Sequence, residues 1–545
     1  MRIAKSGAPW SVILVALKLL TCPLVFAQNR SASTPLAETS AGKLRGETQP
    51  GLSVFRGIRY ARAPIGNLRF HPAQPVAPWK GIRDALDFAP ACPQLVDIDP
   101  TENNNSVMDE DCLALNVWTP GVSSVANLPV MVFIHGGAFI DGSTRNTWYN
   151  GASLARRGKV VVVSLQYRLG AWGFLELAEI GGKEFAESGN LGILDQVAAL
   201  RWIHENIAAF GGDPQSVTVF GESMGGASLN NLLSMTAAQG LIHKAILESS
   251  SAQRVGKSVA QATELARAYM KIAGVTSVAE LQKLSMVEMR TAQAKLFDTW
   301  FGDSSFGPTW GDTVLPQPAL QLWQQGQIPH IPLLLGTNLD EIHFWTQVED
   351  LPIASKPPAL LLKQVSSIAG DRAPSIIQTY RASFPDYGEA VVHLATDVLF
   401  RLPAIRMAES AARQQPTYMY LFTYRPTSAA RDYGAMHSME IPFVFGVLGQ
   451  QDVIAVTGRS SGLQKIQDRM QNAWIRFART GNPNSPGLPP WPRYDETRRA
   501  TMQLGLDCRV VDDPYSTERG SWTGIPFDGI TPSVAQVSAL LAENR

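Results

Sequence analysis

The 545-residue sequence lacks both a net charge and any repetitive segment. Its 47 basic residues balance 47 acidic residues, so the overall charge creates no general attraction to nucleic acid or to anionic lipid. No linker, repeat or low-complexity run divides the chain, and glycine and proline are spread evenly along it. We therefore expect residues 28–545 to form one large α/β domain with insertions.

Two kinds of cofactor signature are also missing. No group of histidines and cysteines has the spacing of a zinc site, and no glycine-rich phosphate loop follows a strand. The sequence therefore calls for neither a metal ion nor an organic cofactor. Any chemistry must come from the side chains of the chain itself.

One serine lies between glycines in a setting that predicts chemistry. The β-branched run 217–220 leads into Gly221-Glu222-Ser223-Met224-Gly225, and residues 226–233 can form a helix. This order of strand, sharp turn and helix is the nucleophile elbow of α/β-hydrolases, in which glycines let strand and helix approach closely. The motif predicts Ser223 as a nucleophile, provided that a base, an acid and an oxyanion-binding loop lie elsewhere.

A pair of glycines follows another predicted strand, residues 128–134, and predicts the oxyanion-binding loop. The segment reads His135-Gly136-Gly137-Ala138-Phe139. Adjacent glycines let backbone N–H groups face a cavity, where they can bind the negative oxygen that forms on an attacked carbonyl. We expect the amides of Gly136, Gly137 and Met224 to form this oxyanion hole. A plain glycine turn is the alternative, which the serine motif disfavours.

The base should be a histidine that follows both the serine and the acid in the chain. His437 is distinguished from the other histidines by a loop of small residues, 434–442, that would let its imidazole reach Ser223. The acid should follow a buried strand, and residues 331–335 are such a strand. The loop after it contains Asp340 and Glu341. Their chemistry alone does not separate these two carboxylates.

Many segments of the chain resemble the type-B carboxylesterase and cholinesterase family of α/β-hydrolases. Besides the serine motif, the matching segments are 57–61, 66–70, 110–117, 167–170, 189–196, 210–214 and 480–483. The resemblance implies a central, mostly parallel twisted sheet with helices on both faces and helical cap insertions. It also implies that Ser223 is the nucleophile, Glu341 the acid and His437 the base. The mostly helical pattern of residues 253–325 favours part of the cap.

The same resemblance implies several structural ties. The family closes a short loop with a disulfide where this chain has Cys92 and Cys112, so we expect that bridge and a free Cys508. Two ion pairs are expected as well, between Arg69 and Glu110 and between Arg168 and Asp195. The chain departs from the family beside the site, with Met224 in place of alanine and Ser438 in place of the glycine after His437.

Residues 1–27 have the pattern of a secretory signal peptide. Arg2 and Lys5 precede an apolar run over residues 10–26, and Val25-Phe26-Ala27 forms a small-residue cleavage site. Export would also suit the expected disulfide, which needs an oxidising compartment. We expect a secreted or periplasmic monomer or homodimer with no membrane span after cleavage. An uncleaved membrane anchor is the alternative.

The sequence says less about the substrate. The loop between the two bridged cysteines holds no aromatic residue, whereas cholinesterases place a tryptophan there, so we do not expect choline esters. The aromatic residues that could line the pocket are Phe139, Trp148, Trp300, Phe301, Trp310, Phe344, Trp345 and Phe400. Arg145 and Arg401 border the active site in the family. If either faces the pocket, polycarboxylic esters become candidates, including tricarballylate esters of the fumonisin type.

We therefore predict a serine carboxylic-ester hydrolase that acts on a small-molecule ester through an acyl-enzyme. A lipase or an acyltransferase with the same three catalytic residues is one alternative. A non-catalytic, cholinesterase-like binding protein is the other, and the presence of all three residues argues against it.

Overall fold

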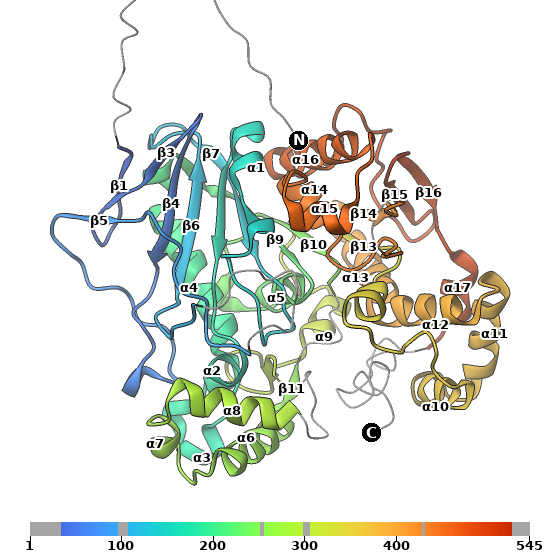
Figure 1. The fold of residues 1–545 in the computed structure, drawn as a ribbon, viewed down its shortest axis with the longest axis horizontal. Coiled ribbons are helices and arrows are strands. Elements are labelled where there is room, and N and C mark those ends of the chain that lie inside the picture. Colours follow the sequence, from blue (N-terminus) through green and yellow to red (C-terminus); the bar gives the residue numbers. More distant parts are fainter. Residues whose placement is uncertain (1–33, 96–106, 251–255, 298–305, 428–430, 526–545) are drawn as a thin grey trace, which may run out of the picture. The chain divides into compact units, whose positions relative to one another are not determined.

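The computed structural model describes residues 34–95, 107–250, 256–297, 306–427 and 431–525. The predicted signal peptide and the pocket candidates Trp300 and Phe301 lie outside these ranges. The core is an 11-stranded sheet, visible at the centre of Figure 1. Its strands are β3 (Glu47–Gln49), β4 (Leu52–Arg59), β6 (Ala114–Thr119), β7 (Leu128–Ile134), β8 (Val161–Leu165), β9 (Gly212–Glu222), β10 (Lys244–Glu248), β13 (Leu333–Asn338), β14 (Thr417–Phe422), β15 (Ala500–Leu504) and β16 (Arg509–Asp512).

The middle of this sheet is parallel and its edges are antiparallel. Across the sheet the strands run in the order β16-β15-β14-β13-β10-β9-β7-β8-β6-β4-β3. The pairings from β15 to β8 in this order are parallel, and the remaining four are antiparallel. Inner strands such as β8 and β13 are buried along their whole length, as expected for strands covered on both faces. The predicted α/β fold with a mostly parallel sheet is confirmed.

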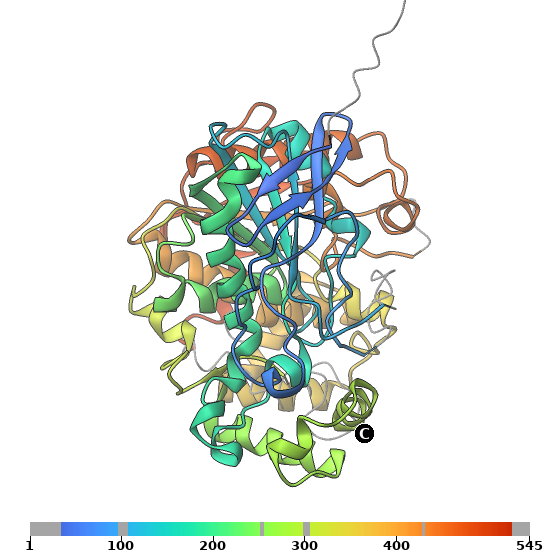
Figure 2. The same cartoon turned by 90° about the vertical axis from the view of Figure 1, so that its left-hand side faces the viewer.

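Helices cover both faces of the sheet, and the residues of β7 alternate between the two layers. Val130, Val132 and Ile134 pack in one apolar cluster, whereas Met131 and Phe133 pack in another. The first cluster includes residues of α4 (Leu191–Asn206), α5 (Met224–Leu232) and α13 (Leu402–Ala412). The second includes residues of α1 (Ala152–Gly158), α14 (Ile441–Phe445) and α16 (Leu463–Thr480). Figure 2 faces the blue N-terminal strands and shows helices on either side of them.

Two helical groups are inserted into this framework. The first, within the stretch predicted to be mostly helical, contains α6 (Val259–Ala273), α7 (Val278–Leu281), α8 (Met286–Phe297) and α9 (Ala319–Gln324). The second contains α10 (Pro358–Ala369), α11 (Ala373–Ser383) and α12 (Tyr387–Thr396), which share a third apolar cluster. This second group was not predicted from the sequence. Across the described ranges, no helix has the length and apolar character needed to cross a bilayer.

The predicted covalent and ionic ties are present. Cys92 and Cys112 form a disulfide, and Cys508 is a free, half-buried thiol. The guanidinium of Arg69 binds the carboxylate of Glu110 through two nitrogens. In the same way Arg168 binds Asp195, with both N–O distances 2.7 Å. Both ion pairs are almost completely buried, so each charge depends on its partner for solvation.

The glycine after the serine turn should be essential for stability. A Cβ atom on Gly225 would lie 2.0 Å from the carbonyl oxygen of Ile134, at the end of β7. We expect Gly225→Ala to lower the free energy of unfolding by about 2–4 kcal/mol, because the backbone of β7 cannot yield without disturbing the sheet. Urea denaturation of the purified variant measures this loss. Gly121→Ala is the matched control, since nothing lies within 4 Å of a Cβ atom there; equal losses in the two variants would contradict the steric argument.

Candidate active site

Ser223 occupies a strained turn between β9 and α5. β9 ends at Glu222, α5 begins at Met224, and Ser223 between them has φ 55° and ψ −123°. A non-glycine residue rarely adopts a positive φ, and such strain persists only where the surrounding structure enforces it. One restraint is the hydrogen bond, 3.0 Å long, from the amide of Ser223 to the carbonyl of Glu248. The strand, turn and helix that the motif predicts are all present.

The predicted glycine loop lies directly against this turn. A Cβ atom on Gly136 would lie 3.0 Å from the Cβ of Ser223. One on Gly137, where φ is 94°, would lie 2.1 Å from a carboxylate oxygen of Asp141. A side chain at Gly137 would clash with Asp141, and one at Gly136 would be in tight contact with Ser223, so glycine suits both positions.

The two side chains predicted as acid and base are in contact. The Nδ1 atom of His437 lies 2.6 Å from Oε2 of Glu341. The other oxygen of Glu341 accepts a hydrogen bond from the amide of Asn338 at 2.7 Å. Burial raises the pKa of Glu341 to about 8, which the Asn338 amide and the Ser249 hydroxyl partly oppose. A carboxylate in such a dry site is stabilised most when the imidazole beside it carries a proton.

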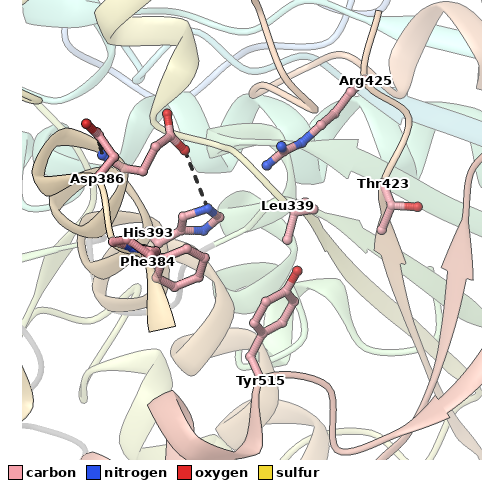
Figure 3. Close-up of a pocket in the computed structure, with 9 residues that line it drawn as sticks. Leu339, Phe384, Asp386, His393, Thr423, Arg425 and Tyr515 are labelled. Atoms are coloured by element: carbon pink, nitrogen blue, oxygen red, sulfur yellow. Dashed lines mark hydrogen bonds and ion pairs between the residues drawn. The ribbon is translucent and has the colours of Figure 1, made fainter. Parts of the chain in front are cut away.

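Asp340, the competing candidate for the acid, faces away from His437. Its oxygens accept hydrogen bonds from Arg425 at 2.6 and 2.8 Å, and one of them also accepts the amide of Ala435 at 2.8 Å. This side of the loop borders a cavity of about 490 Å³, in which Figure 3 shows the guanidinium of Arg425 extending toward His393 and the hydroxyl of Tyr515 pointing toward Leu339. Of the two neighbouring carboxylates, Glu341 is therefore the one that can orient the imidazole.

The opposite nitrogen of His437 meets a second carboxylate that the sequence analysis missed. Its Nε2 atom lies 3.1 Å from Oε1 of Glu222, the residue just before Ser223. The same oxygen accepts a hydrogen bond of 2.7 Å from the hydroxyl of Ser438. The signal was available in the sequence, because Glu222 and Ser438 are the chain neighbours of the predicted nucleophile and base.

Glu222 belongs to a cluster of buried acids, which we call the carboxylate cluster: Glu222, Glu248, Glu341 and Glu440. Each is at most 2% exposed. Burial raises the pKa of Glu222 and of Glu440 to about 8, and that of Glu248 well above its usual value. The hydroxyls and N–H groups that bind the cluster come from Ser249, Asn338, Ser438 and Trp474. These donors make the burial of so much potential charge tolerable.

Aromatic rings surround His437. The ring centroids of Phe400, Trp345 and Phe344 lie 4.9, 5.2 and 6.1 Å from that of the imidazole. Two other pocket candidates have different surroundings: Phe139 is buried against Phe174, 5.0 Å away, and the indole nitrogen of Trp148 donates to Asp452. Trp310 is half-buried in the short strand β12 (Thr309–Trp310). The site is thus lined on the side of His437 by large apolar groups.

The two candidate arginines are engaged by the protein itself. Arg401 binds Asp397 through two nitrogens, donates to the carbonyl of Pro514 at 2.9 Å and stacks over the ring of Tyr515. It is 5% exposed. An Nη atom of Arg145 donates to two backbone carbonyls, at 3.3 and 3.4 Å. These contacts leave the arginines poorly suited to bind a carboxylated substrate.

These features define a serine hydrolase of the α/β-hydrolase class. The serine lies on a strained strand-to-helix turn, a glycine loop lies against it, and the histidine is bound by a glutamate. Within the described ranges, no three His, Cys, Asp or Glu side chains converge on a position for a metal ion. The chain belongs to the carboxylesterase family, whose model matches residues 33–522, and it is a carboxylic ester hydrolase. The predicted family and the predicted class of enzyme are thereby confirmed.

Similar proteins come from bacteria and from mammals. The para-nitrobenzyl esterase of Bacillus subtilis (strain 168) is 36% identical over 498 residues, which cover 89% of this chain and 97% of the relative. Carboxylesterase 1C of Rattus norvegicus is 32% identical over 550 residues, covering 94% and 97%. The crystal structure of a Geobacillus stearothermophilus carboxylesterase at pH 6.2 superposes with a TM-score of 0.81 at 36% identity, covering 90% of this chain and 100% of that one. None of these similarities supports the fumonisin-type specificity.

Two matched substitutions separate the neighbouring carboxylates. We expect Glu341→Gln to lower kcat by about a thousandfold to ten-thousandfold, because the amide cannot hold the imidazole in the correct tautomer. Asp340→Asn removes the same charge one residue earlier and should keep kcat within about a factor of ten, since Asp340 binds Arg425 and the backbone instead. Steady-state hydrolysis of a p-nitrophenyl ester measures both. A larger loss in Asp340→Asn would reverse the assignment.

The carboxylate cluster should make stability depend on pH. Because burial raises the pKa of Glu440 from 4.5 to about 8, the folded state prefers its protonated form. The preference of the folded state for protonated Glu440 therefore adds its full amount to the free energy of unfolding below pH 4.5, and this amount is lost as the pH rises through about 8. We expect Glu440→Gln to reduce the fall in the free energy of unfolding across this range by about 1–3 kcal/mol. Urea denaturation at several pH values tests this, with exposed Glu38→Gln as the control; identical slopes in wild type and Glu440→Gln would contradict it.

Proposed function

We propose that Ser223, His437 and Glu341 are the nucleophile, base and acid of a carboxylesterase that works through an acyl-enzyme. The 2.6 Å contact between Glu341 and Nδ1 of His437 carries this proposal. A carboxylate at Nδ1 keeps the proton on that nitrogen, so Nε2 is left to accept the proton of Ser223. The oxygen of Ser223 then attacks the ester carbonyl, and the protonated imidazole returns the proton to the departing alcohol. Water repeats the sequence and releases the acid.

The negative oxygen of the tetrahedral intermediate would be bound by backbone amides of Gly136, Gly137 and Met224. The close approach of Gly136 to the Cβ of Ser223 supports this assignment. Amides fixed before the reaction stabilise the new charge without reorganising, and a single lost donor typically lowers kcat by about a hundredfold to a thousandfold.

The substrates we propose are uncharged esters with an aromatic or apolar group. Trp345 and Phe400 flank the imidazole with their rings, and Arg145 and Arg401 are engaged by protein groups. The similarity to a para-nitrobenzyl esterase supports the same class of ester. A lipase or an acyltransferase with this triad would be recognised by interfacial activation or by transfer to an added alcohol.

We also propose that the protein is exported. The support comes from the signal-peptide pattern of residues 1–27 and from the disulfide between Cys92 and Cys112, a bond that persists in oxidising compartments.

A panel of esters tests the enzymatic proposal. Wild-type protein should hydrolyse p-nitrobenzyl and p-nitrophenyl esters, and Ser223→Ala should lose this activity by about a hundred-thousandfold or more. Phe400→Ala should raise KM for aromatic esters by about tenfold while changing KM for an acetate ester little, because the ring area buried against the substrate is lost. Initial rates across the panel give both values.

The same panel should include tricarballylate esters, which are anionic and so test the preference for uncharged esters. A higher kcat/KM for these anionic esters than for neutral aromatic esters would contradict the proposed substrate class. Activity that survives in Ser223→Ala would contradict the proposed mechanism.

A further inference from the structure

Ser438 is an unusual residue for its backbone conformation. Its φ is 65°, a value that suits glycine better than a residue with a Cβ atom. The side chain therefore costs backbone strain, which suggests that the hydroxyl does something that glycine would not. The hydroxyl donates a hydrogen bond of 2.7 Å to Oε1 of Glu222. That same oxygen lies 3.1 Å from Nε2 of His437.

Opposing interactions act on the protonation of Glu222. Burial and the carboxylates of Glu440 and Glu341 favour its protonated form, whereas the imidazole of His437 and the hydroxyl of Ser438 favour its ionised form. The other titratable groups that face it are Glu248, at the end of β10, and Tyr420, in β14. Burial is the largest of these effects and raises the pKa of Glu222 to about 8, close enough to neutral pH that a single hydrogen bond to the carboxylate can shift its protonation state.

We propose that Ser438 is a positioning residue whose hydroxyl holds the Glu222 carboxylate, in its ionised form, against Nε2 of His437. The proposal rests on the function proposed above. When Ser223 attacks the ester, its proton passes to Nε2, its oxygen forms the new bond to the carbonyl carbon, and the carbonyl electron pair moves onto oxygen. The imidazolium formed in this step has Glu341 at Nδ1 and Glu222 at Nε2. Glu222 accepts no proton; it stabilises the positive charge until Nε2 releases its proton to the leaving alcohol.

Removing the hydroxyl should weaken this effect without removing any reacting group. In Ser438→Ala, Glu222 stays protonated over a wider pH range and no longer stabilises the imidazolium. We expect kcat at neutral pH to fall by about threefold to thirtyfold, the range for one lost hydrogen bond to a charged group, with KM changed less than about twofold. The inflection on the acidic side of the kcat profile should move to lower pH, because neutral His437 loses a neighbouring negative charge that favours its protonation.

The test compares three variants at position 438 in full-length protein, with a p-nitrophenyl ester as the probe. Ser438→Ala keeps the Cβ atom and its strain, whereas Ser438→Gly relieves the strain, so a common kinetic change in both identifies the hydroxyl as its cause. Ser438→Thr keeps a hydroxyl and should restore most of the lost kcat. Glu222→Gln supplies the second background: if Ser438 acts through Glu222, Ser438→Ala should have little further effect there.

The outcomes are distinguishable from failure of the proposed function. Wild-type kcat and an unmoved pH profile in both Ser438→Ala and Ser438→Gly would overturn the role of Ser438 and leave the esterase intact. The same holds if Ser438→Ala has its full effect in the Glu222→Gln background, because the effect would then reach His437 by another route. A folded wild type that shows no Ser223-dependent hydrolysis would overturn both proposals. Urea denaturation of each variant shows whether it is folded.

Discussion

The contact between the backbone of Gly225 and that of Ile134 governs the geometry of the whole site. It sets the distance between the serine turn and the end of β7, from which the glycine loop departs. Next to this close approach, Ser223 has a positive φ and Gly136 lies against it. Since β7 and β9 are neighbouring parallel strands with buried residues on both faces, neither can shift without disturbing the layers of helices. The serine and the loop that faces it are therefore held by two neighbouring strands at the centre of the sheet.

A second constraint is the burial of four carboxylic acids in one cluster, two of which contact the imidazole of His437. The carboxylate cluster receives hydrogen bonds from four parts of the fold: the end of β13, the residue after β10, the loop before α14, and α16. Charges and dipoles interact strongly in such a dry environment, so small changes in these contacts alter the proton affinity of the histidine. Burying these carboxylates costs solvation free energy that an apolar core would not lose, and the reactive histidine depends on them.

The sequence was most informative where the functional groups are close neighbours in the chain. Ser223 and the glycine pair are flanked by the strands and turns that position them, so local pattern was sufficient. His437 was found from its loop and from resemblance. Chemistry could not separate Asp340 from Glu341, because the decision depends on Arg425 and Ala435, which lie far along the chain. The contact between Glu222 and His437 joins distant segments and was missed, although Glu222 is the chain neighbour of the predicted nucleophile. The second helical insertion was not predicted either.

The opposed directions of Asp340 and Glu341 have a consequence for how this loop can change. One carboxylate serves an ion pair with Arg425 and the other serves His437, and a single peptide bond separates them. Substitutions elsewhere in the loop alter side chains one at a time. A residue inserted before this pair, in contrast, would move Asp340 to the position that faces the histidine, and a deleted residue would move Glu341 to the position that faces the arginine. In homologous proteins, the loop after β13 should therefore tolerate substitutions but keep a constant length.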